Sequence, residues 1–141
     1  MAEAILVHRV REAGLEEQIE IDSAGTGDWH IGDAPHEGTL KILKTYGIEH
    51  PMKARQIRAE DLDEFDYLIV MDDKNERDVR ALPTGRVHIA RLLDYLPEAK
   101  DKNVPDPYFT GDFDAVYRMV SAACDNLLDA VRREQGLESR L

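Results

Sequence analysis

Residues 67–71 read Tyr-Leu-Ile-Val-Met, an apolar run that no charged or amide side chain interrupts. A strand with one face in water alternates apolar and polar side chains, so this run predicts a strand that is covered on both faces. Strands of that kind belong to parallel sheets with helices packed on each side. The run therefore restricts the chain to α/β architectures.

The segments around this run alternate between helix and strand patterns, with no repeat and no linker. Residues 19–22 alternate apolar and acidic side chains and residues 87–90 form a short apolar run, so both predict strands. Helical spacing, glycine stops and capping residues predict helices at residues 2–13, 35–46, 59–64, 73–82 and 113–131. We expect a single α/β domain over residues 1–141, a three-layer sandwich around a parallel sheet.

Two of the predicted helices carry specific local signals. Asp73 and Glu76 have the spacing of a capping box, which predicts that Asp73 caps the start of one helix. The longest helix has apolar side chains at i, i+3, i+4 and i+7 between Phe113 and Val131, the spacing of a helix with one buried face. Cys124 lies on that face, where a free cysteine behaves as a small hydrophobe with a neutral thiol.

Composition excludes several classes of function. Lys and Arg total 18 against 29 Asp and Glu, a net charge of −11, and so acidic a surface repels nucleic acid and anionic membranes. No apolar run approaches the ~18 residues of a membrane span. Cys124 is the only cysteine and the 5 histidines are scattered, so we expect no disulfide, no metal site and no cofactor. One cysteine also fits a reducing, cytoplasmic location.

The hexapeptide Val-Pro-Asp-Pro-Tyr-Phe at residues 104–109 places one carboxylate, Asp106, between two prolines and beside two aromatic rings. Asp and Pro are common turn residues, so the segment reads first as a turn whose rings cap the core. The same residues also suit a general acid held beside a pocket for an aromatic leaving group. Local composition leaves both interpretations open.

Six separate segments of the chain form a recognisable set: MAEAIL at 1–6, DSAGTGDWHIG at 22–32, ARQI at 54–57, FDYLIVMDDKN at 65–75, RLLDY at 91–95 and VPDPYF at 104–109. By these segments and their order, the chain resembles the low-molecular-weight protein tyrosine phosphatases over essentially its whole length.

The resemblance implies a cysteine-dependent hydrolysis of phosphotyrosine proteins or small aryl phosphates. In this family a C-x5-R-S/T-P loop binds the phosphate, and its cysteine attacks phosphorus to form a cysteinyl-phosphate. The resemblance makes Asp106 the general acid and base, places Trp29 and Tyr108 at the walls of the ring pocket, and makes Ser23 a support for the phosphate loop. Locally, Trp29 also reads as a half-covered surface ring and Ser23 as the start of a turn. Asp72 and Asn75 match family positions too, although helix capping explains them.

Two departures from the family pattern stand out. Phe109 replaces a tyrosine that the family often carries. More importantly, Met1 aligns just after the phosphate loop, so the resemblance implies an N-terminally truncated chain without the first strand, the nucleophilic cysteine and the clamping arginine. We expect a slot in the core between residues 19–22 and 67–71, marginal stability and no activity of these 141 residues alone.

Three hypotheses remain open. The chain begins at an internal methionine of an active phosphatase; or it is a catalytically dead module that binds or regulates a partner; or it is a same-fold arginine phosphatase or arsenate reductase. Arsenate reduction of this type uses further cysteines, and this chain has only Cys124. The physiological target, the oligomeric state and the preference between tyrosine and arginine phosphate are not specified by the sequence.

Overall fold

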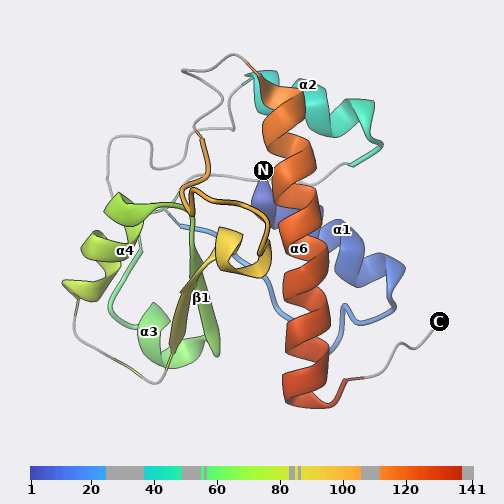
Figure 1. The fold of residues 1–141 in the computed structure, drawn as a ribbon. Helices are drawn as coiled ribbons and strands as arrows, with labels where there is room; N and C mark the ends of the chain where they lie inside the picture. The colour runs from blue at the N-terminus through green and yellow to red at the C-terminus, as the bar shows by residue number, and fades with distance from the viewer. Residues whose placement is uncertain are drawn as a thin grey trace.

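A computed structural model describes residues 1–24, 37–48, 55, 57–82, 85, 87–105 and 112–137 (Figure 1). Figure 1 shows α1 and α6 on one side of strand β1 and α3 and α4 on the other, the arrangement expected for an α/β domain. The elements are α1 (Ala2–Glu12), α2 (Glu37–Thr45), α3 (Asp61–Glu64), β1 (Tyr67–Val70), α4 (Asp73–Arg80), β2 (His88–Arg91), the 3-10 helix η1 (Leu92–Tyr95) and α6 (Phe113–Gln135).

The sheet confirms the parallel pairing predicted from the apolar run at 67–71. β1 pairs with β2 in parallel, with Tyr67 opposite His88 and Val70 opposite Arg91. The predicted strand at 19–22 is wrong, because these residues are described and none of them is in a strand. Ile19 and Ile21 nevertheless pack on the small cluster around Leu15. Their alternation therefore reported which side chains are covered, whereas a strand also requires a neighbouring backbone to bond with.

Helix boundaries follow the local signals with one correction. α1 ends at Glu12, and Gly14 follows its C-cap, Ala13. The φ of Gly14, 72°, lies in the left-handed region that favours glycine. Asp73 does not cap α4: the N-cap is Asp72, whose Oδ1 accepts the Asn75 N–H at 2.8 Å. Glu76 instead accepts hydrogen bonds from arginine side chains. Aspartate at either position is a common helix cap, and in the structure Asp72 takes that place.

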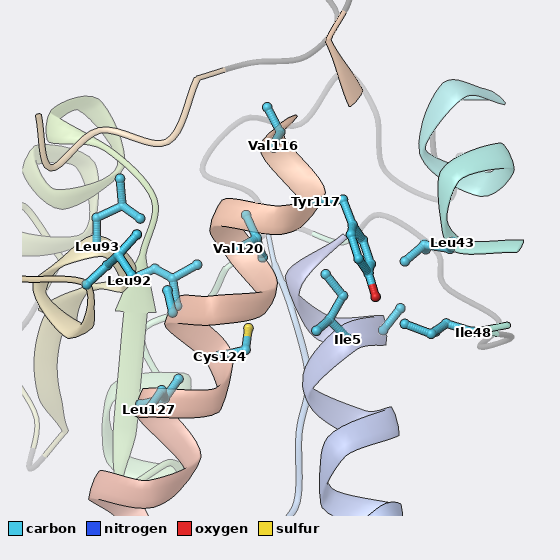
Figure 2. Packing of buried hydrophobic residues seen from close by; sticks show 13 residues of the cluster. Ile5, Leu43, Ile48, Leu92, Leu93, Val116, Tyr117, Val120, Cys124 and Leu127 are labelled. Carbon is cyan, nitrogen blue, oxygen red and sulfur yellow. The ribbon is translucent and has the colours of Figure 1, made fainter. Parts of the chain in front are cut away.

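The predicted apolar face of α6 forms the main core. It packs against α1 and η1, and Figure 2 shows the Cys124 side chain directed from α6 toward α1. Ile5, Leu93 and Cys124 are at most 1% exposed. Within the described ranges, no helix has the length and apolar character that crossing a bilayer requires. Buried members of the main cluster on α6 are Val116, Tyr117, Val120, Ala123, Cys124 and Leu127.

A buried carboxylate joins the segment before Ser23 to α3. Asp61 is 2% exposed, and its Oδ2 accepts the Arg55 Nη1–H at 3.0 Å and the Arg58 N–H at 2.8 Å. The Arg55 Nε also donates to Asp22 Oδ2 at 3.1 Å. Burial alone would raise the pKa of Asp61, but the hydrogen bonds from Arg55 and from the Arg58 amide lower it below its usual value. Arg55 thus bridges residues that are far apart in the sequence.

Replacing Asp61 with alanine is expected to destabilise the fold by about 2–3 kcal/mol, less than is usual for a fully buried pair because Arg55 retains access to water. A lowered folded-state pKa means that this contribution is present above the unfolded carboxyl pKa of ~4 and is lost as the pH falls below it. Urea unfolding at pH 7 and at acidic pH measures both effects. Glu60→Ala is the matched control, since Glu60 is exposed and makes no capping bond. Equal midpoints for the two variants at pH 7 would contradict the assignment.

Candidate functional site at a core groove

A groove of about 930 Å³ runs beside β1. Residues 18–24 line one side of it, residues 64–72 line another, and apolar side chains of α1 and α6 complete the lining. It therefore lies between the two segments where we expected a slot. Most of its exposed lining is apolar, but Glu3, Ser23, Asp72 and Asn75 contribute polar atoms. Other polar residues line it as well, among them Asp22, Arg55 and Asp61.

Ser23 is the one predicted site residue that the structure describes. Its Oγ donates to Glu3 Oε1 at 2.7 Å, in the first turn of α1, and its N–H donates to Asp22 Oδ1 at 2.8 Å. Asp22 is in turn held by Arg55. Ser23 is therefore fixed against the start of α1, at the lining of the groove, by contacts with carboxylates. Trp29, Asp106 and Tyr108 lie outside the described residues.

The segment that leads to Asp106 is described as far as Pro105, and it is joined to the carboxyl end of β1. The Val104 N–H donates to the Met71 carbonyl oxygen at 2.9 Å. The Met71 N–H is accepted by Asn75 Oδ1 at 3.3 Å, and Asp72 begins α4. Val104 and Pro105 both line the groove. The carboxyl ends of strands are where ligands bind in open parallel sheets, so this segment enters the position expected of a site.

Cys124 confirms the structural role predicted from its helical spacing. Its side chain is 1% exposed and its Sγ lies 4.0 Å from the Ala2 carbonyl oxygen. Burial, with a smaller contribution from the charge of Asp125, raises the pKa of the Cys124 thiol to about 12. A nucleophilic cysteine must be a thiolate near neutral pH, so Cys124 does not fit that role.

Cys124 is expected to react with a thiol reagent at pH 8 at least about 100-fold more slowly than a free cysteine, because the native thiol is both neutral and covered. The rate of labelling by an aromatic disulfide measures this, and denaturant should restore a fast reaction. The matched control is Ala122→Cys in a Cys124→Ala background, since Ala122 is exposed two positions away on the same helix. Fast stoichiometric labelling of native Cys124 would contradict its structural role.

Sequence reasoning missed the contacts that join distant segments at this site. Glu3 binds Ser23, and Asn103 binds Asp73 through both of its side-chain groups. No periodicity or local motif could have indicated these pairs, because each joins residues 20 or 30 positions apart. Among the described His, Cys, Asp and Glu side chains, none form a group of three that could hold a metal ion.

Comparison with known proteins gives one consistent result. The family model described as low molecular weight phosphotyrosine protein phosphatase matches residues 1–137. The low molecular weight protein-tyrosine-phosphatase YfkJ of Bacillus subtilis (strain 168) is 45% identical over 140 residues, covering 97% of this chain and 90% of the relative. PtpA of Staphylococcus epidermidis (strain RP62A) is 38% identical over 141 residues, covering 99% of this chain and 90% of the relative.

Solved structures agree with the sequence match. The crystal structure of YfkJ from Bacillus subtilis superimposes with a TM-score of 0.90 at 44% identity, covering 95% of this chain and 86% of that one. The Drosophila arginine phosphatase structure gives a TM-score of 0.83 at 32% identity, covering 93% and 88%. Fold, sequence and order of segments thus point the same way, and this chain belongs to the low molecular weight phosphotyrosine protein phosphatase family.

Proposed function

We propose that this chain supplies the acid–base residue and the ring pocket of a phosphotyrosine phosphatase site. Asp106 protonates the departing phenolate while a cysteine thiolate attacks phosphorus, so the P–O bond to the ring breaks as the S–P bond forms. Asp106 then takes a proton from the water that attacks the cysteinyl-phosphate, which releases inorganic phosphate and restores the thiolate. Trp29 and Tyr108 pack against the phenyl ring. Ser23 is a hydrogen-bonding support for the phosphate loop.

The observation that carries this proposal is the Val104 N–H bond to Met71 O, which joins the root of the Asp106 loop to the carboxyl end of β1. Val104 and Pro105 then line the same groove as Ser23. Asp106 directly follows a residue that lines the groove, which favours the general-acid interpretation over a simple turn. The membership of the family supports the same role for the Asp-Pro-Tyr segment.

The nucleophile must come from elsewhere than Cys124. The 141 residues hold one cysteine, and its thiol is buried with its pKa raised to about 12. We therefore propose that these 141 residues alone are inactive and that catalysis requires a segment of the form C-x5-R-S/T-P. We call the 141 residues preceded by a first strand and such a segment the extended chain.

The extended chain is expected to hydrolyse a phosphotyrosine peptide with at least about tenfold higher kcat/KM than a phosphoarginine peptide of the same sequence. The reason is that flat aromatic rings at Trp29 and Tyr108 suit a phenyl group, and stacking contributes about 0.5–1.5 kcal/mol a pair. The second candidate function, arginine phosphatase, rests on the likeness to the Drosophila structure. Release of inorganic phosphate from both peptides decides between them, and a preference for phosphoarginine would overturn the proposed substrate class.

A further inference from the structure

Residues 101–104, which precede Pro105 and are called the loop root below, are held by two hydrogen bonds between Asn103 and Asp73. We call this pair of hydrogen bonds the clamp. Asn103 Oδ1 accepts the Asp73 N–H at 2.8 Å, and Asn103 Nδ2 donates to Asp73 Oδ2 at 3.3 Å. The side chain therefore uses both its acceptor and its donor on one residue, which fixes its orientation as a single contact would not. The Asp73 N–H belongs to the first turn of α4, where helical partners are lacking, so this bond also satisfies an orphan donor.

Asp73 is itself held from the opposite side by the sheet. Arg91, the last residue of β2, forms an ion pair with Asp73 Oδ1, and its Nε donates to Glu76 Oε1 at 2.7 Å. Asn103 binds the other carboxylate oxygen of Asp73. The contacts therefore run from the end of β2, through the start of α4, to the loop root. Through Asp73, Asn103 is linked to the start of α4 and to the end of β2.

The residues before Asn103 are fixed as well. Asp101 Oδ1 accepts the Asn103 N–H at 2.9 Å, and Lys102 Nζ donates to the carbonyl oxygens of Leu93 and Leu96, each at 3.1 Å. Val104 then bonds to the end of β1. Pro105 has no N–H, so Val104 provides the last backbone donor before Asp106. A change of direction at Asn103 is thus carried into the proline-restricted segment instead of being absorbed by flexible residues.

We propose that Asn103 is a positioning residue for the general acid: its clamp on Asp73 sets the direction of residues 104 and 105, on which the reach of the following residue, Asp106, toward the leaving oxygen depends. This inference rests on the proposed function of Asp106. The plainer role for Asn103 is stabilisation of the start of α4. Proton transfer depends on hydrogen-bond distance far more steeply than stability does, so kinetics with different leaving groups separate the two roles.

The test compares Asn103→Ala with the unchanged extended chain on two aryl phosphates. Phenyl phosphate has a poor leaving group that needs a proton, and 2,4-dinitrophenyl phosphate has a good one that does not. We expect kcat/KM for phenyl phosphate to fall about 10- to 100-fold, the cost of a displacement near 1 Å at a reacting group. The value for the dinitrophenyl ester should change less than about twofold, because binding and attack are intact. An equal loss on both substrates, or no loss on either, overturns the inference.

Asn126→Ala is the matched control, because the Asn126 Nδ2 donates to the Tyr95 carbonyl oxygen at 2.7 Å on another part of the surface. It removes one asparagine hydrogen bond and should leave both rates unchanged. Asp106→Ala separates this inference from the proposed function. Loss on phenyl phosphate in Asp106→Ala without loss in Asn103→Ala overturns the clamp alone, whereas no loss in Asp106→Ala overturns the acid assignment itself.

Two further measurements keep the inference testable if Asn103→Ala lowers stability. In the double variant with Asp106→Ala, removing Asn103 should add no further loss on phenyl phosphate, because the group that it positions is gone. In the 141-residue chain, hydrogen exchange of the Asp73 amide should become faster in Asn103→Ala and stay unchanged in Asn126→Ala. Additive kinetic losses, or unchanged Asp73 exchange, contradict the clamp.

Discussion

The 141-residue chain is expected to release no detectable phosphate from a phosphotyrosine peptide, whereas the extended chain should accelerate the reaction at least ~10⁶-fold over the uncatalysed rate. The physical reason is the absence of an available thiolate: Cys124 is 1% exposed and its thiol pKa is raised to about 12. A general acid alone assists departure of the phenolate but attacks nothing. A continuous phosphate-release assay on both purified chains measures the difference.

Two variants of the extended chain assign the nucleophile in the same assay. Serine at the cysteine of the C-x5-R loop should abolish turnover. Cys124→Ala should leave kcat within about threefold, because a buried cysteine acts there as a small apolar group. Turnover by the 141-residue chain, or loss of turnover in Cys124→Ala with the fold intact, would show that the nucleophile has been assigned wrongly.

Replacing Asp106 with alanine in the extended chain is expected to lower kcat for phenyl phosphate by on the order of 10²–10⁴, the usual contribution of general acid–base catalysis. With the proposed role of Asp106, the phenolate would then leave without a proton and the attacking water would lose its base. KM should change little, since the carboxyl is proposed to act on the bridging oxygen rather than on the phosphate charge. Steady-state kinetics of the two proteins give both constants. Lys100→Ala is a suitable control at an exposed position, and it should leave both constants unchanged.

The sequence predicted the elements whose local pattern and burial agree. The run at 67–71 is a strand paired in parallel, and the stripe from Phe113 is the longest helix. Cys124 is buried, as its position on that stripe indicated. In each case one physical cause, removal of apolar side chains from water, sets both the sequence pattern and the structure. Patterns of this kind are readable without knowing the partner.

The failures have a shared cause of their own. Residues 19–22 have the alternation of a strand, yet they form none, because strand pairing depends on a neighbouring backbone that alternation does not report. Asp73 was taken for a cap that is Asp72, since both fit the local rule. The clamp between Asn103 and Asp73 joins residues 30 positions apart and leaves no local signature. The roles of Trp29, Asp106 and Tyr108 stay predictions, because these residues lie outside the part of the chain that the structure describes.

The dependence of kcat/KM on the leaving group tests the central claim most directly. For the extended chain, log kcat/KM should be nearly independent of the pKa of the phenol across a series of aryl phosphates, because Asp106 is proposed to supply the proton to each departing oxygen. In Asp106→Ala the same plot should fall steeply as the phenol becomes a weaker acid. Parallel plots for the two proteins, whatever their slope, would contradict the account, because they would mean that Asp106 delivers no proton to the leaving group.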